Sequence, residues 1–205
     1  MTNFIPVFPL AMVVYPTELV NLHIFEPRYK QLIADSVNTQ KPFGMATTIN
    51  GQLQDFGCTV TIVNITKTYD SGEMDLTIQG QDVIKILDFL QEVPNKMYSG
   101  AIVNYPQNNF STSNKIKLQK IQNRLTQAFA ILEINKVINP NKYSYNYAHY
   151  IGLTLAQQHE LLTLLTEDER LDYVTYYLQK MLTNNFQKQN VLDKVKLNGH
   201  FRLNK

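Results

Sequence analysis

The chain has 205 residues, of which 44% are hydrophobic and 18% are charged, a composition that excludes wholesale disorder. Its 19 basic and 17 acidic residues leave a net charge of +2, which gives no overall reason to expect nucleic acid or an anionic membrane as a partner. The single cysteine, Cys58, excludes an internal disulfide framework and a cysteine-based zinc cluster.

The N-terminal segment Phe4–Tyr15 is apolar, yet it matches neither a signal peptide nor a membrane span. The first basic residue is Arg28, so the positively charged start of a signal peptide is missing. The segment is about half the roughly 20 residues that a spanning helix needs, and it contains Pro6 and Pro9. We therefore expect a cytoplasmic protein without a membrane partner.

Residues 1–110 have the pattern of short strands separated by turns, which predicts a β-rich region. The first run, Phe4–Val14, is expected to be an edge strand or a bent one, because proline cannot donate in a sheet ladder. The clearest hairpin joins Thr59–Thr68 to Met74–Ile78 through Asp70-Ser71-Gly72. Further strands are expected over 42–49, 84–90 and 101–105, and one short helix is expected to begin at Pro27.

Residues 111–183 change to helical spacing, which predicts a helical bundle. Ser113 is placed to cap a long helix that ends at Asn139-Pro140-Asn141. A short helix over Ser144–Ile151 is expected to stop at Gly152, because glycine readily takes the left-handed conformation that ends many helices.

Two capping boxes predict where the last two helices begin. Thr154 is followed three residues later by Gln157, and Thr166 by Glu169. The last helix is expected to bury a stripe made of Leu171, Val174, Leu178 and Met181. After Thr183 the helical pattern decays, and the basic tail 184–205 is expected to be flexible.

Charge divides the chain in a similar way. Residues 1–110 hold 6 basic and 10 acidic residues, a net charge of −4, whereas residues 111–205 hold 13 and 7, a net charge of +6. We therefore expect three parts: a β-rich domain over 1–110, a helical bundle over 111–183 and the tail over 184–205.

The sequence lacks the common catalytic motifs, since no phosphate-binding loop, G-x-S-x-G, H-E-x-x-H or C-x-x-C can be written on it. Cys58 beside a strand is interpreted as a small buried hydrophobe, with an activated nucleophile as the alternative. His149 and His159 lie ten residues apart across Gly152, and a metal site there would need a third ligand. No catalytic residue, metal site or cofactor is therefore expected.

Tyrosine is concentrated in the helical part, where seven of the twelve tyrosines fall between Tyr143 and Tyr177. Their helical spacing is more typical of packing between helices than of a surface on which bases stack.

Three short strings near the N-terminus form the densest signal: Phe8-Pro9-Leu10, Tyr15-Pro16 and Asn21-Leu22-His23-Ile24-Phe25-Glu26-Pro27-Arg28-Tyr29. They predict a strand, a loop, a second strand and a helix start, with Glu26 at the positive helix N-terminus. This pattern resembles the N-terminal substrate-binding domain of Lon proteases, in its stand-alone bacterial form. Weaker similarity continues through Gly57–Ile62 and Ile151–Leu182.

The chain departs from the family pattern at three positions. Tyr15 replaces a phenylalanine, and Asn21 replaces the usual proline. Val83 stands where the family commonly carries an arginine three residues after the glycine that is Gly80 here, so no contact of that arginine is carried over.

The resemblance implies an α+β fold: a PUA-like β pseudo-barrel with one short helix, followed by a C-terminal helical bundle. It also implies a non-catalytic module that recognises unfolded or degradation-prone polypeptides, with a protease or chaperone as a further partner class. The ATPase and Ser–Lys peptidase domains of full-length Lon have no room in 205 residues. Burial of the ligand in an apolar groove and addition of a strand to a sheet edge both remain open.

Within the family motif, Phe25, Glu26, Arg28 and Tyr29 are the candidate binding residues, and each is equally suited to a structural role. We expect Glu26 and Arg28 to form an ordered polar pair that supports the barrel.

Two rival functions come from other classes. PUA-like barrels also bind RNA, and the C-terminal half is basic, although acidic residues of 167–172 separate its two basic stretches. The second rival is a small-molecule enzyme that uses Cys58 or a histidine. An RNA-binding module is the main alternative to polypeptide recognition.

Overall fold

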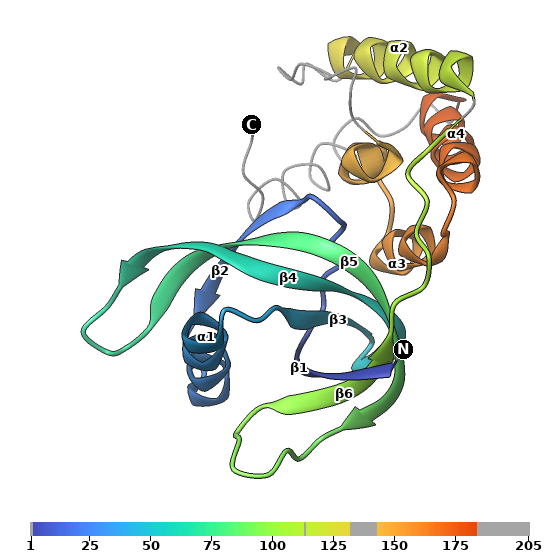
Figure 1. Ribbon diagram of the computed structural model, residues 1–205. Coiled ribbons are helices and arrows are strands. Elements are labelled where there is room, and N and C mark those ends of the chain that lie inside the picture. Colours follow the sequence, from blue (N-terminus) through green and yellow to red (C-terminus); the bar gives the residue numbers. More distant parts are fainter. Residues whose placement is uncertain (1, 113, 132–142, 184–205) are drawn as a thin grey trace. The chain divides into compact units, whose positions relative to one another are not determined.

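Strands fill the first half of the chain and helices most of the second half in the computed structural model, which describes residues 2–112, 114–131 and 143–183 (Figure 1). The protein is therefore of the α+β class, as the sequence predicts. The chain divides into two compact units, the first ending at Gln107 and the second beginning at Asn108. The expected division into 1–110, 111–183 and 184–205 stays a prediction, and the tail 184–205 lies outside the described residues.

Hydrogen-bonded strands in the first unit form one mixed sheet. They are β1 (Thr2–Leu10), β2 (Leu19–Ile24), β3 (Phe43–Ile49), β4 (Gln52–Thr68), β5 (Met74–Leu90) and β6 (Ser99–Asn104). The strand order is β2-β5-β4-β3-β1-β6, and β5 also pairs with β6. The series β5-β4-β3-β1-β6 thus returns to β5 and closes a ring, while β2 extends the sheet from β5. This closure is consistent with the pseudo-barrel that the family resemblance implies.

Strand β1 changes its partner halfway along. Residues 2–7 pair antiparallel with β6, and residues 7–10 pair parallel with β3. Pro6 and Pro9 therefore each lie where β1 has a partner on one side only, a position in which a missing backbone N–H is tolerated. β1 as a whole is not an edge strand, because it lies between β3 and β6, but each proline has the local environment of one.

Strands β4 and β5 are longer than the sequence predicts. β4 begins at Gln52, before the expected Thr59, and β5 joins two expected strands into one of 17 residues. Their pairing shifts register three times, between Cys58 and Val60, between Ile62 and Asn64, and between Ile65 and Lys67. At each shift the side chains change faces of the sheet, so the apolar pattern with a period of two is interrupted. The sequence pattern therefore predicts several short strands where the structure has two long ones.

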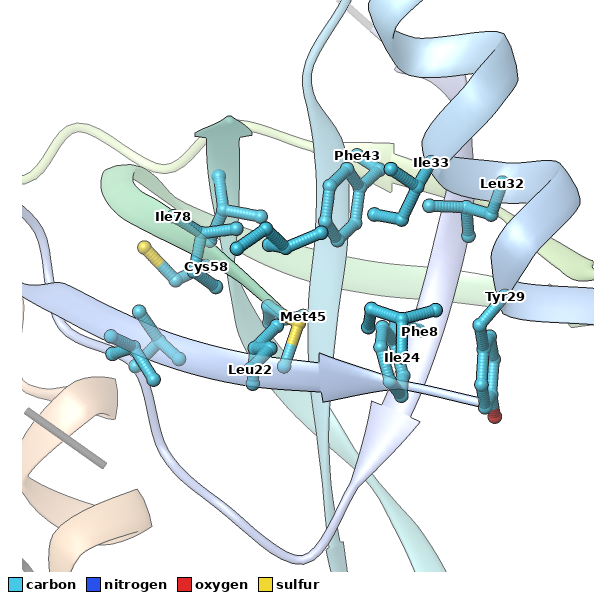
Figure 2. Close-up of a cluster of buried hydrophobic side chains, with 14 of the residues drawn as sticks. Phe8, Leu22, Ile24, Tyr29, Leu32, Ile33, Phe43, Met45, Cys58 and Ile78 are labelled. Carbon is cyan, nitrogen blue, oxygen red and sulfur yellow. The ribbon is translucent and has the colours of Figure 1, made fainter. Parts of the chain in front are cut away.

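The larger of the buried hydrophobic clusters described in the first unit, with 15 residues, combines strand residues with helix α1 (Pro27–Thr39). Figure 2 shows Leu32 and Ile33 of α1 facing Phe43 of β3, with Met45 of the same strand and Ile78 of β5 in the same cluster. All five are almost fully buried. Helix α1 therefore buries an apolar stripe made of Tyr29, Leu32 and Ile33, and it begins at Pro27 as the sequence predicts.

The second unit contains helices α2 (Lys115–Ile131), η1 (Ser144–Tyr150), α3 (Leu155–Thr163) and α4 (Glu167–Thr183). Asn114 caps α2, because its side-chain oxygen accepts a hydrogen bond from the Lys117 backbone N–H at 2.9 Å. The expected cap Ser113 and the expected end of this helix, Asn139–Asn141, lie outside the described residues.

The other helix boundaries follow the sequence closely. Both capping boxes form, with Thr154 Oγ1 accepting from the Gln157 N–H at 3.3 Å and Thr166 Oγ1 accepting from the Glu169 N–H at 3.4 Å. η1 is a 3-10 helix, followed by Gly152 at a φ of 69°. The predicted apolar stripe of α4 is buried. None of the described helices is long and apolar enough to cross a membrane.

Candidate functional site

The family motif links the end of β2 to the start of α1. Ile24 is buried, the next residue, Phe25, has 57% of its surface exposed, and Glu26 precedes the helix in an extended conformation. Pro27 then occupies the first turn of α1. Backbone N–H groups in the first turn have no acceptor within the helix, so a proline there costs no hydrogen bond.

Glu26 and Arg28 form the polar pair that the sequence predicts. One carboxylate oxygen, Oε2 of Glu26, accepts from Arg28 Nε at 2.8 Å and from Nη2 at 2.7 Å. The Arg28 guanidinium lies 4.6 Å from the centre of the Tyr29 ring. Both charged side chains are well exposed, so the pair orders the turn at the helix start more than it stabilises the fold.

Tyr29 connects two of the sequence strings. Its ring stacks on Phe8 with the centroids 3.8 Å apart and an interplanar angle of 17° (Figure 2). Burial raises the pKa of the Tyr29 hydroxyl, and the neighbouring Arg28 opposes that rise. Tyr29 therefore packs in the core, whereas Phe25 presents its ring to solvent. A binding role for Phe25, Glu26, Arg28 and Tyr29 stays a prediction.

Cys58 lies inside the barrel core. Its side chain is completely buried beside Met45 and Ile78, and burial raises the pKa of the thiol well above its ordinary value (Figure 2). Such a thiol is held in its unreactive, protonated form. The interpretation of Cys58 as a small buried hydrophobe fits this environment, and a nucleophilic role does not.

The two histidines considered as ligands, His149 on η1 and His159 on α3, are both buried. No group of three or more His, Cys, Asp or Glu side chains suited to a metal ion is found within residues 2–112, 114–131 and 143–183. The tyrosines of the helical unit have mixed environments: Tyr145 and Tyr147 are buried, and Tyr143 and Tyr176 are exposed.

Gly80 and Val83 occupy the segment that departs from the family pattern. The backbone of Gly80 exchanges hydrogen bonds with the 15–18 loop, accepting from the Thr17 N–H and donating to the Glu18 carbonyl, each at 2.9 Å. A Cβ at Gly80 would lie 2.0 Å from the Tyr15 carbonyl oxygen. Val83 is buried opposite Cys58 in the β4–β5 pairing, so this position contributes to the core here.

The distal part of the β4–β5 hairpin, residues 61–79, forms an arm with β2. In Figure 1 the turn of this hairpin projects beyond α1. His23 of β2 holds the arm near its tip, with Nδ1 2.7 Å from Asp75 Oδ1 and Nε2 3.5 Å from Glu73 Oε2. The Tyr69 hydroxyl donates to Asp75 Oδ2 at 2.8 Å. Hydrogen bonds from His23 and then Tyr69 hold the pKa of the Asp75 carboxyl below its ordinary value.

Two edges of the arm have a partner strand on one side only within the described residues. β2 pairs with β5 alone. Along β4, pairing with β3 stops at Val60, opposite Phe43, while pairing with β5 continues to Thr68. Unpaired strand edges present backbone N–H and C=O groups to any extended chain that approaches them.

The sequence of the chain matches one protein-family model over most of its length. Residues 5–180 match the model of the ATP-dependent protease La (LON) substrate-binding domain. The chain belongs to this family of Lon substrate-binding domains.

Solved structures of Lon N-terminal domains have the same fold. The Lon N-terminal domain protein from Xanthomonas campestris superposes with a TM-score of 0.64 at 19% identity, over 85% of this chain and 98% of that one. The N-terminal domain of the Mycobacterium avium complex Lon protease gives a TM-score of 0.68 at 15% identity, over 86% of this chain and 98% of that one. The family resemblance identified from the sequence strings is therefore confirmed.

Sequence reasoning about this Lon substrate-binding domain did not find the open edge of β4. The signal available was the uncharged, β-branched run Thr59–Thr66, which has strong strand character. Nothing local in that run tells which side of the strand lacks a partner, because the partners come from distant segments.

Proposed function

We propose that the protein is a non-catalytic module that binds segments of unfolded or degradation-prone polypeptides. The observation that carries this proposal is the extent of the Lon substrate-binding match, which covers residues 5–180 and so nearly all the described residues. A separate protease or chaperone that receives the bound chain is the further partner class that the proposal includes.

Surface chemistry of the first unit supports the same function. Several large apolar side chains there are well exposed: Phe4, Phe25, Val37, Val63, Ile65, Leu87 and Met97. Unfolded chains differ from folded ones in exposing apolar side chains and unpaired backbone groups. The first unit can bind both, through its exposed apolar side chains and its open strand edges. The buried thiol of Cys58 gives no support to a covalent mechanism.

The proposal is tested by titrating the labelled protein with reduced, unfolded casein and, in parallel, with structured RNA. We expect weak casein binding, with a Kd of roughly micromolar to millimolar, because one isolated domain lacks the avidity of an oligomer. Apolar and backbone contacts predict little change between moderate salt concentrations. Neither ATP nor casein should be turned over by the purified protein.

RNA binding would give the opposite salt response. Its most suitable surface is α2, where Lys115, Lys120 and Arg124 are exposed, whereas Lys117 forms an ion pair with Asp172 of α4. Tight RNA binding with a steep salt dependence, lost on replacing the three exposed cations, would overturn the proposal in favour of a nucleic-acid function.

A further inference from the structure

We propose that the outer edge of β4, residues Thr61–Thr68, is where an extended polypeptide segment adds to the sheet as a further strand. The inference rests on the proposed function, and it names the surface and the mode of binding. It chooses strand addition over burial of the ligand in a groove.

Backbone geometry is the first reason for this choice. β5 pairs with residues 61–68 of β4 on one side, and the pairing of β4 with β3 stops at Val60 on the other. The eight residues of this edge therefore offer hydrogen-bonding groups that only another extended backbone can satisfy regularly.

Side chains along this edge favour an apolar ligand. Val63 and Ile65 are 53% and 43% exposed, and residues 63–68 are all exposed. Ile65 lies opposite Leu76 of β5, which in turn lies opposite Leu22 of β2, and both leucines are buried. The apolar face of the arm thus continues outwards to Ile65, where an added strand would cover it.

The edge of β2 lacks this combination. The core side of this strand is already buried, at Val20, Leu22 and Ile24. An added strand would therefore cover no exposed large apolar side chain of β2. On the other face, His23 is held by Asp75 and Glu73. We therefore place the added strand on β4.

Two bulges limit how much chain the β4 edge can hold. The register shifts leave Val63 and Thr66 as extra residues in the pairing with β5. A bulge bends its strand and increases the local twist, so a regular ladder cannot run along the whole edge. Such an edge suits a short segment bound weakly, and it opposes long pairing with the same edge of a second copy.

Charge identifies the ligand more closely. Residues 61–66 carry no charge, whereas residues 67–75 at the tip hold Asp70, Glu73 and Asp75. These three acidic residues face two lysines, Lys67 of β4 and Lys30 of α1, whose ammonium group donates to the Ser71 carbonyl at 3.0 Å. Residues 1–110 as a whole have a net charge of −4. The complementary ligand is a short extended segment with apolar side chains at alternate positions and a lysine or arginine at the end that reaches the tip.

The test uses a ten-residue peptide with alternating valine and threonine and one terminal lysine. Its two analogues carry N-methyl groups at alternate residues or aspartate in place of lysine. On binding to the full chain, amides within residues 61–68 should gain protection from hydrogen exchange, and those of β2 should not. N-methylation removes backbone donors and should abolish binding, and the aspartate analogue should bind several-fold more weakly.

Matched variants test the location independently. Val63→Lys with Ile65→Lys should weaken binding of the peptide and of casein by tenfold or more. The control, Ile116→Lys with Leu182→Lys, makes the same charge change at exposed apolar side chains of the second unit, 70% and 39% exposed, and should stay within twofold. Thermal melting of each variant checks that the fold is intact.

Several results would overturn the inference. If casein binds the Val63→Lys, Ile65→Lys variant as tightly as the original chain, or without protection of residues 61–68, strand addition at β4 is wrong although the proposed function stands. Failure of casein to bind the original chain would contradict the proposed function itself. Edge protection that appears without peptide and depends on protein concentration would assign the edge to a second copy. Edge protection released by truncation after Asn185 would assign it to the chain's own tail.

Discussion

The barrel of the first unit and the helices of the second differ in what lies buried inside them. The barrel core is apolar, with Phe43, Val60 and Ile78 completely buried and Cys58 among them. In the second unit the largest fully buried side chain is Arg170, together with Glu167. One region is held by strand pairing and apolar packing, and the other has an ion pair within its core.

All three nitrogen atoms of the Arg170 guanidinium group have hydrogen-bond partners. Nε lies 3.0 Å from Glu167 Oε2, Nη1 donates to Asn108 Oδ1 at 2.7 Å and to the Leu164 carbonyl at 2.8 Å, and Nη2 donates to the Asn109 carbonyl at 2.7 Å. Glu167 also accepts from the N–H and hydroxyl of Ser144, each at 2.8 Å. The network ties together the start of the unit, η1, the α3–α4 loop and α4.

The two units therefore tolerate different substitutions. An apolar core loses stability in proportion to the volume removed. A buried ion pair loses far more when one partner is removed than when both are, because the remaining charge is left without compensation.

The largest effect is expected from Arg170→Met, which leaves the Glu167 carboxylate buried without its cation. We expect a loss of about 3–5 kcal/mol in the free energy of unfolding of the second unit. Denaturant unfolding measures the loss, and hydrogen exchange of α4 assigns it to that unit. The double variant Arg170→Met, Glu167→Gln should lose less than the single one.

The exposed Arg124 of α2 provides the control for this change. Arg124→Met removes the same type of side chain from the surface and should stay within about 0.5 kcal/mol. If Arg170→Met behaved like Arg124→Met, the ion pair would not be what holds the second unit together.

A smaller effect is expected in the barrel from Gly80→Ala. The new Cβ would lie 2.0 Å from the backbone oxygen of Tyr15, so the loop or the strand must move. Overpacking of this kind costs about 1–3 kcal/mol. Gly44→Ala is the matched control in β3, because its nearest atom is the end of the Ile5 side chain, at 2.9 Å, which can turn away. Equal melting temperatures of the two variants would contradict this interpretation.

The same contrast explains how much the sequence alone could predict. Capping boxes at Thr154 and Thr166 are local, since donor and acceptor lie three residues apart, and both were predictable. Arg170 and Asn108 are 62 residues apart, and no periodicity places them together. Arg170 lies within the segment Ile151–Leu182, whose similarity supported the family resemblance, but nothing in that segment indicated that Arg170 is completely buried.

In the barrel, prediction failed where the strands depart from a regular ladder. Val63 and Thr66 are extra residues of β4 in its pairing with β5, and at Thr59 the extra residue is on β5, so the alternation of side chains stops and restarts. The candidate binding string was predictable as strand, loop and helix start because its signals are Pro27 and the apolar stripe behind it. The open edge of β4 was not, because an edge is defined by the strand that is missing beside it.

Within the arm, Asp75→Asn should have a smaller effect that depends on pH. The depressed pKa of the folded carboxyl means that Asp75 stabilises the fold above the ordinary carboxyl pKa of about 4, and that this contribution is lost as the pH falls through the folded-state pKa. The melting temperatures of the variant and the original chain should therefore differ at neutral pH and converge in acid. Asp70→Asn, in the same hairpin, is the control. A difference that grows as the pH falls would refute the assignment.

The smallest effect is expected from truncation after Asn185. Residues 184–205 lie outside the described residues, and their sequence scatters Val191, Leu192, Val195 and Leu197 among polar residues without a helical cap. Truncation removes residues 186–205, which hold five basic residues and one acidic residue, so the net charge of the part after residue 110 falls from +6 to +2. The melting temperature should change only slightly, and casein affinity should stay the same, because the proposed ligand contacts are apolar and backbone groups on the barrel. A loss of several degrees, which corresponds to about 1 kcal/mol or more in a domain of this size, would instead make the tail part of the fold.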